Sequence, residues 1–193
     1  MSLRVVQAVA ETERNDDFHL GRLMVLLRSA DLRKTKVSTK AKAVEGIMKL
    51  AKLDFLLRYP TCLERALIAL GKDAAIARVQ PRERTSIETT MIRFRYGPWD
   101  ARYRRWLGLL TARGVVSLEL DGNTIEIGLT ERGRHLADRI RQDSLFRDLS
   151  MRSDAIIGFA GGMSGTKLKA FIYETIPEIL DMRWGDEIKF DSE

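Results

Sequence analysis

Apolar residues recur at helical spacing through the first third of the chain. Leu20, Leu23, Met24 and Leu27 fall on one face of a helix through residues 18–30, which Asp16 or Asp17 would cap. Residues 31–40 are predicted to form a basic loop, and Ser38 or Thr39 then opens a long helix that ends at Arg58. Apolar residues stripe two sides of this helix, which predicts that it lies in the centre of the core. The stripes are Val44, Ile47, Met48, Ala51 and Phe55 on one side and Leu50, Leu53 and Leu57 on the other.

The pattern becomes shorter and more varied in the middle of the chain. Tyr59-Pro60 ends the long helix because the residue before proline avoids the helical region, and Thr61 is predicted to cap a short helix that closes at Gly71. Residues 72–86 show no clear period and are predicted to be irregular. Residues 91–98 alternate, which predicts a short half-buried strand or arm with Ile92, Phe94 and Tyr96 on one side and Arg93 and Arg95 on the other.

A helix and a hairpin follow this arm. Pro98 is predicted to start a helix that Gly114 ends. Its inner face would hold Trp99, Tyr103, Trp106, Leu107 and Leu110. Residues 115–129 alternate on both sides of Asp121-Gly122, which is a strong hairpin signal. Thr130 then caps a helix with Leu136 and Ile140 directed inward.

A helix, a hairpin and a further helix in this order are typical of a winged-helix module, in which the hairpin is the wing. The predicted fold class is therefore α+β and mainly helical, with a winged-helix-like core and a C-terminal helical extension. We divide the chain into a winged-helix-like domain with N-terminal helices at 1–142 and a connector with a helix at 143–193. Pro177 is expected to interrupt or kink that C-terminal helix.

The stretch GGMSGTKLKAF at residues 161–171 resembles a phosphate-binding loop. When the pattern G-x-x-x-x-G-K-[ST] is aligned on Lys167, Thr166 occupies the second glycine position and Leu168 the hydroxyl position. Neither residue suits its role, since Thr166 adds a Cβ and Leu168 has no oxygen for Mg²⁺. We interpret the stretch as a connector that ends in a helix capped by Ser164 or Thr166, and we expect no bound nucleotide or other cofactor.

Composition limits the range of functions. The chain has 193 residues, of which 45% are hydrophobic, and a single cysteine, Cys62, so that no internal disulfide can form. Cys62 is expected to be a buried small residue. The absence of a long apolar run indicates a protein without a membrane segment, and we expect it in the cytoplasm.

Positive charge is concentrated in one part of the chain. Residues 78–113 hold nine arginines and only three acids, within a net charge of +6. Such a cluster favours a polyanion or an acidic protein surface, although an ordinary solvated face remains the alternative. Arg93, Arg95, Arg102 and Arg105 are the residues predicted to face a partner or DNA.

Residues with catalytic potential are few. The two histidines, His19 and His135, are far apart in sequence and are expected at the surface or an interface. Together with one cysteine they cannot complete a metal site, and no nucleophile signature is present. We therefore expect a protein that is not an enzyme, with no catalytic, metal or cofactor-binding residues.

Three stretches together resemble one family: KLAKLDFLLRYP at 49–60, MIRFRYGPWDARYRRWLGLLTARGVV at 91–116, and LTERG at 129–133. They are similar to the middle component of bacterial ABC-type three-component systems, including those of the Lamassu kind. The resemblance covers residues 17–140 and implies a small winged-helix-type protein that acts with an SMC-like ATPase and an effector in anti-phage or anti-plasmid defence. It also implies that ATP is bound by the ATPase subunit.

The leading hypothesis is thus a non-enzymatic subunit that bridges an SMC-like ATPase and an effector in a DNA-sensing complex. It would contact DNA, if at all, through phosphates at the arginine cluster. The alternative is a stand-alone winged-helix transcriptional regulator. That alternative needs a recognition helix with polar side chains for base edges, whereas the predicted helix at 99–112 offers arginines and no Asn or Gln.

Overall fold

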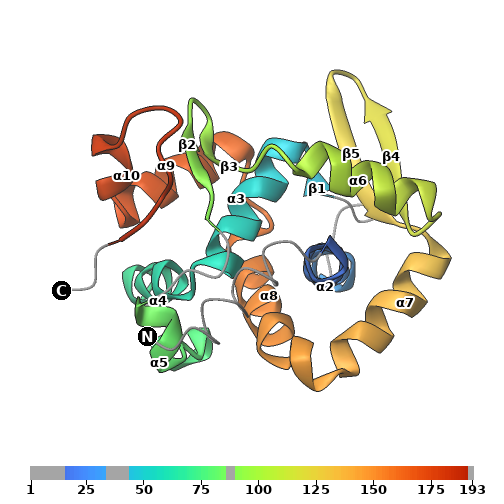
Figure 1. Ribbon diagram of the computed structural model, residues 1–193, viewed down its shortest axis with the longest axis horizontal. Helices are drawn as coiled ribbons and strands as arrows, with labels where there is room; N and C mark the ends of the chain where they lie inside the picture. Colours follow the sequence, from blue (N-terminus) through green and yellow to red (C-terminus); the bar gives the residue numbers. More distant parts are fainter. Residues whose placement is uncertain (1–15, 34–43, 86–89, 191–193) are drawn as a thin grey trace, which may run out of the picture.

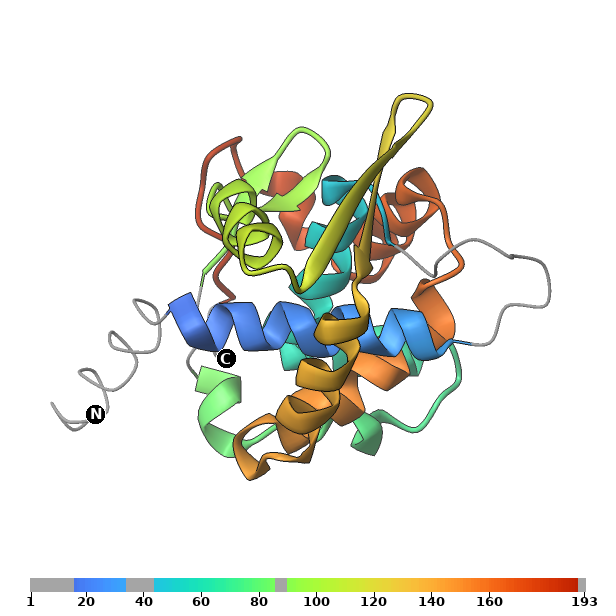
Figure 2. The same ribbon diagram turned by 90° about the vertical axis from the view of Figure 1, so that its right-hand side faces the viewer.

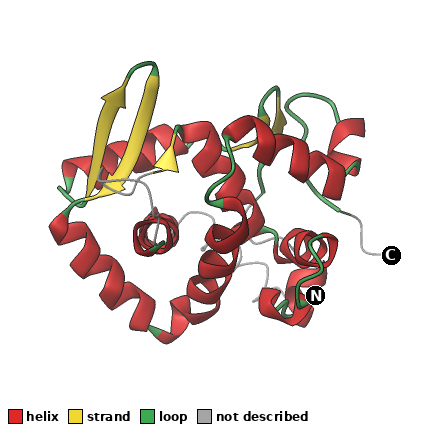
Figure 3. Cartoon of the chain, turned by 180° about the vertical axis from the view of Figure 1, so that it is seen from behind, coloured by secondary structure: helices red, strands yellow, loops and turns green. Residues whose placement is uncertain are grey.

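Helix α2 (Asp16–Leu32) lies in the middle of the molecule, and other elements surround it. The computed structural model describes residues 16–33, 44–85 and 90–190. Figure 1 looks along the axis of α2 and shows α3, α6, α7, α8 and the β4–β5 hairpin arranged around it. Figure 3 shows the same arrangement from behind. The predicted first helix is confirmed, and it is buried on nearly all sides, including at the polar residues His19 and Arg22.

The second predicted helix is shorter than its pattern suggests. Helix α3 spans Ile47–Arg58, and Val44–Glu45, which were predicted to be helical, form strand β1. Gly46 separates the two elements with a φ of 85°, a value that favours glycine. The predicted start at Ser38 or Thr39 and most of the predicted basic loop fall outside the described residues. Within α3 the prediction of a central core helix is confirmed, because every residue from Lys49 to Arg58 is buried.

Three short helices follow α3. Helix α4 (Pro60–Ala69) begins at Pro60 and its N-cap is Tyr59, so the predicted cap at Thr61 is wrong by two residues. Proline suits the first helical position because the N–H that it lacks would have no partner inside the helix. Residues 72–86, predicted to be irregular, contain the 3₁₀ helix η1 (Ala74–Ala77) and the short helix α5 (Pro81–Thr85).

The arm at 91–98 is a small hairpin. Strand β2 (Ile92–Phe94) pairs antiparallel with β3 (Gly97–Trp99), and Pro98 lies opposite Arg93. The prediction that Pro98 starts a helix is therefore wrong. Helix α6 (Tyr103–Ala112) begins later, where the Asp100 side chain accepts a hydrogen bond from the Arg102 backbone N–H at 2.9 Å.

The predicted wing is confirmed as a hairpin of β4 (Val116–Asp121) and β5 (Thr124–Leu129). Its turn is Gly122-Asn123, and the sheet has the order β1-β5-β4. Figure 2 shows this hairpin projecting beyond the helices. Helix α7 (Glu131–Gln142) follows, and Thr130 caps it by accepting a hydrogen bond from the Gly133 N–H, as predicted. Leu136 was expected to point inward but is exposed, and Gly133 and Ala137 form the buried face instead.

The C-terminal residues are more helical than their pattern indicates. Helix α8 (Arg147–Ala160) was not predicted; it follows the 3₁₀ helix η2 (Ser144–Phe146) and packs on α2 and α3. Helix α9 (Gly165–Thr175) is capped by Ser164, and Pro177 separates it from α10 (Glu178–Asp181), as expected. Buried residues on both sides of the predicted boundary at 142/143 belong to the same hydrophobic core. No helix in the described ranges is long and apolar enough to cross a membrane.

Candidate functional site

The predicted partner-binding arginines lie in two places. Arg93 and Arg95 belong to the β2–β3 hairpin, whereas Arg102 and Arg105 lie at the N-terminal end of α6. Arg95 and Arg105 are exposed, and Arg93 and Arg102 are half-buried. The predicted surface is thus divided between two elements of the structure.

The two α6 arginines contact carboxylates of the same chain. Arg102 donates to Asp100 from Nε and Nη2, and its guanidinium lies 4.9 Å from the centre of the Trp106 ring. Arg105 pairs with Asp16 at the start of α2, which also accepts a hydrogen bond from Trp106 Nε1 at 3.0 Å. Trp106 is fully buried, as its helical stripe predicts.

Other arginines of the 78–113 cluster are also paired with acids that are distant in sequence. Arg78 lies 2.8 Å from Asp148, and Arg84 lies 2.9 Å from Glu64. The scarcity of acids within 78–113 therefore does not persist in three dimensions. Folding neutralises much of the positive charge that the sequence places there.

A buried ionic network lies beneath α6. Asp54 of α3 accepts two hydrogen bonds from Arg22 of α2, at 2.7 and 3.0 Å, and one from the Tyr103 hydroxyl at 2.6 Å. Arg58 donates to Asp100 at 2.9 Å and lies 3.9 Å from Asp54. These contacts join α2, α3 and α6, so the network holds the helix that carries Arg102 and Arg105.

The charges in this network depend on one another. Burial alone would raise the pKa of Asp54, but Arg22 and Arg58 outweigh it and lower that pKa. Burial likewise opposes ionisation of Asp100, yet the bond from Arg102 and the charge of Arg58 lower its pKa to about 2. His19 is fully buried, with Nδ1 2.6 Å from Arg22 Nη1, so its predicted surface position is wrong.

The β2–β3 hairpin carries exposed aromatic rings beside its arginines. Tyr96 is 49% exposed and Phe94 39% exposed, so the predicted burial of their side of the arm is wrong beyond Ile92. The Arg95 guanidinium lies 5.3 Å from the centre of the Tyr96 ring. This distance is within the range of a cation–π contact.

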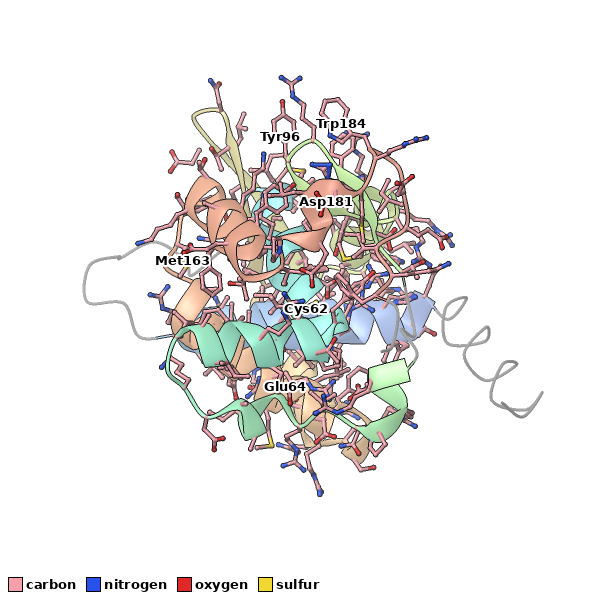
Figure 4. All side chains as sticks on the ribbon, turned by 90° about the vertical axis from the view of Figure 1, so that its left-hand side faces the viewer. Cys62, Glu64, Tyr96, Met163, Asp181 and Trp184 are labelled. Carbon is pink, nitrogen blue, oxygen red and sulfur yellow. The ribbon has the colours of Figure 1, made fainter. Side chains whose placement is uncertain are left out.

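A C-terminal segment continues the same surface. Gly185 N–H donates to Arg93 O, and Arg93 N–H donates to Asp186 O, each at 2.8 Å. The Arg93 side chain donates from Nη1 to Met182 O at 2.6 Å. These bonds hold Trp184, which is 68% exposed, next to the hairpin, and Figure 4 shows Trp184 and Tyr96 on the same side of the molecule.

A lysine of α9 adjoins this surface, and a lysine of α3 is buried beside the hairpin. Lys169 of α9 donates to Arg95 O at 3.1 Å, and its Nζ lies 5.4 Å from the centre of the Tyr173 ring. Lys52 of α3 is 3% exposed and donates to Met48 O. Burial and the nearby charge of Lys169 lower the pKa of Lys52 to about 8. We call the set Phe94, Arg95, Tyr96, Lys169 and Trp184 the ring face; Lys169 is half-buried and the other four side chains are exposed.

The wing presents a second surface of different chemistry. Leu118, Leu120 and Ile125 share one face of the hairpin, and they are 40%, 76% and 39% exposed. On the other face Glu119 lies directly opposite Glu126. Residues 115–129 also include Asp121 but no lysine or arginine. In Figure 1 the wing lies to the right of the β2–β3 hairpin, and both hairpins point toward the top of the view.

The remaining candidate residues have structural positions. Ser164 Oγ accepts a hydrogen bond from Lys167 N–H at 3.2 Å, which confirms Ser164 as a helix cap. Cys62 is buried as expected, and burial raises the pKa of its thiol. Among the described residues, no group of three or more His, Cys, Asp or Glu side chains could hold a metal ion.

Sequence reasoning missed Trp184 and the exposed wing tip as candidate surface residues. Trp184 stands in an otherwise polar stretch, RWGDE, and a lone tryptophan among charged residues was the available signal. For the wing, the signal was the absence of basic residues between 115 and 129. Comparisons with protein-family models, with curated proteins and with solved structures found no match.

Proposed function

We propose that this chain is a non-enzymatic winged-helix subunit that bridges an SMC-like ATPase and an effector in a DNA-sensing defence complex of the cytoplasm. The resemblance of residues 49–60, 91–116 and 129–133 to such middle components suggests the role. The order α2, β1, α3, α6, β4, β5 supports the winged-helix assignment, as does the pairing of β1 with β5. In this assignment α6 takes the place of the recognition helix, and residues 59–102 are an insertion before it.

The wing is the observation that carries the proposal. A wing that contacts DNA approaches phosphates, and carboxylates at Glu119, Asp121 and Glu126 would be repelled by them. An exposed apolar face formed by Leu118, Leu120 and Ile125 gains nothing from a phosphate backbone. Burial of this face against a protein is favourable, because fully burying one leucine side chain contributes roughly 1.5–3 kcal/mol of binding free energy. The wing therefore suits a protein partner.

Helix α6 gives less support to the alternative, a stand-alone transcriptional regulator. Its arginines Arg102 and Arg105 contact Asp100 and Asp16, so reaching a base edge would require breaking those pairs. The helix contains no Asn or Gln for reading adenine. Arg104, which is exposed, suits a phosphate or carboxylate contact better than sequence readout.

The proposal assigns ATP binding to the partner ATPase. In this chain the glycine-rich stretch before α9 ends in a serine cap, and its Lys167 backbone N–H bonds to Ser164. DNA contact by the complex would then involve phosphates and residues such as Arg93 and Arg95, with no cofactor in this subunit.

Co-purification with the proteins encoded beside it tests the role. We expect the chain to elute from size exclusion with a large coiled-coil ATPase. The Leu118→Lys, Leu120→Lys double variant should lose this association and keep its melting temperature, because both side chains are exposed.

A matched control is Ile68→Lys on α4, where the isoleucine is 61% exposed and far from the wing in sequence. This variant should still associate. Association that survives in the wing variant would refute the wing as the docking surface. Tight, sequence-specific duplex binding by the isolated chain would favour the regulator instead.

A further inference from the structure

We propose that the ring face binds single-stranded nucleic acid, with bases stacked on Tyr96 and Trp184 and phosphates held near Arg95 and Lys169. The ring face is separate from the wing, and the proposal does not depend on the adaptor role. It rests on the placement of exposed rings, on the cations between them and on how firmly both are held.

The rings are held in place by the fold. Trp184 follows Arg183, whose N–H donates to Asp186 Oδ2 at 2.8 Å, and precedes Gly185, whose N–H donates to Arg93 O. Residues 185–187 therefore run alongside β2 as a third extended segment of this hairpin, with an antiparallel bridge between Ile92 and Glu187. Backbone bonds on both sides of Trp184 fix the position of its main chain, and its indole is 68% exposed, so the ring is available to stack on a base.

Cations lie among these rings. Arg95 lies over Tyr96, and Lys169 is bonded to the Arg95 carbonyl. Beneath them Lys52 is buried without a carboxylate partner among the described residues, and Gly97 makes room for it, since a Cβ at Gly97 would lie 3.1 Å from Lys52 Cε. An ammonium in that position adds positive potential that a bound phosphate would compensate.

The nearby carboxylates only partly offset this charge. Glu187 pairs with Lys189, Glu178 pairs with Arg65, and Asp186 accepts a bond from backbone N–H. Asp181 of α10 is exposed, and Figure 4 shows it below Trp184. The ring face thus keeps a positive balance from Arg95, Lys169 and Arg183 around its aromatic surface.

The chemistry favours single strands over the alternatives. In a duplex the flat faces of the bases are covered by their neighbours, so exposed rings find no stacking partner there. An acidic peptide would use the cations but would leave Phe94, Tyr96 and Trp184 exposed. Among these three ligands, unpaired bases on a phosphate backbone are the one that uses both features.

Fluorescence anisotropy of the isolated full chain with a labelled 20-nucleotide oligothymidine tests the proposal. We expect binding that weakens with salt, with a log–log slope of about −0.7 for each phosphate contact. An unlabelled competitor duplex of the same length should compete poorly. Replacing Tyr96 and Trp184 by alanine should weaken binding by roughly 5- to 150-fold for each ring, while Tyr96→Phe and Trp184→Phe should keep it.

Two further measurements make the test decisive. Leu120→Ala on the wing, a control with a comparably exposed apolar side chain, should bind like the unmodified chain. Trp106 is buried and Trp99 half-buried, so oligothymidine should quench tryptophan emission in the unmodified chain and not in Trp184→Phe. Absence of binding, equal affinity for the duplex, or unchanged affinity in the double alanine variant with normal melting would each overturn the proposal.

Discussion

Removing the negative charge of Asp54 is expected to destabilise the protein severely. Asp54 is fully buried and accepts hydrogen bonds from Nε and Nη2 of Arg22 and from the Tyr103 hydroxyl. In Asp54→Asn the shape is nearly unchanged, but the new amide N–H₂ would face donors of Arg22 or Tyr103. Arg22 would then be a buried cation without a carboxylate partner among the described residues.

The size of the effect follows from which charges remain compensated. Breaking a buried ion pair by removing one partner costs about 3–5 kcal/mol, because the other charge stays buried. Arg58 keeps its 2.9 Å contact with Asp100, so only Arg22 loses its principal partner. We therefore expect a loss near the lower limit, about 3 kcal/mol, which is a large part of a typical domain's stability.

Urea unfolding followed by circular dichroism measures this loss. The midpoint should fall while the dependence on urea stays the same, since the folded surface is unchanged. Asp138→Asn is the matched control: this aspartate pairs with Arg28 at 2.8 Å, but its side chain is 43% exposed. Its loss should cost at most about 1 kcal/mol. An Asp54→Asn variant no less stable than this control would refute the buried-network argument.

Two further predictions concern the core and the acid range. Gly133→Ala should destabilise the protein by about 1–3 kcal/mol or more in thermal melts, because its Cβ would lie 1.9 Å from the Val115 carbonyl oxygen. The control Gly158→Ala on α8 places its Cβ in open space and should stabilise the protein slightly. Equal effects of the two substitutions would show that α7 can move away from Val115. The free energy of unfolding should fall as pH drops from about 5 through 4 toward 2, because the pKa values of Asp54 and Asp100 are lower in the folded chain than the ordinary value near 3.9. Urea midpoints measured across this range test it, and stability that rises with acid would contradict it.

Elements with local signals were predicted well from the sequence. The wing has alternation and a glycine turn, α7 has a threonine cap, and the stripe of α6 placed Trp106 correctly in the core. In each case the information lies within a few neighbouring residues. The prediction that Pro98 starts a helix was wrong because a proline that can start a helix can equally occupy a strand position that needs no N–H. The start of α6 is set instead by the bond from the Arg102 N–H to the Asp100 side chain.

Helix α8 shows why the remainder was missed. Its buried face includes Ser150, Arg152 and Ser153, so the apolar period is interrupted. Arg152 can be buried because it bonds Glu83 and the Ala77 carbonyl, residues about seventy positions earlier in the chain. The partners of the arginine cluster were hidden from the sequence for the same reason, since Arg105 pairs with Asp16 on α2. Ion pairs between residues this far apart in the sequence cannot be recognised from the pattern of neighbouring residues.

Tyr59 gives the C-terminal segment a mechanical connection to the core. Its hydroxyl accepts a bond from Met91 N–H at 2.7 Å and donates to Ile188 O at 2.9 Å, while Ile188 N–H donates to Met91 O. Tension applied at the end of the chain would therefore load these bonds and those to Arg93 before it reached any helix. A tether or tag pulled from that end would break the bonds of Ile188 to Tyr59 and Met91 first, and the force would reach Trp184 only after they had failed.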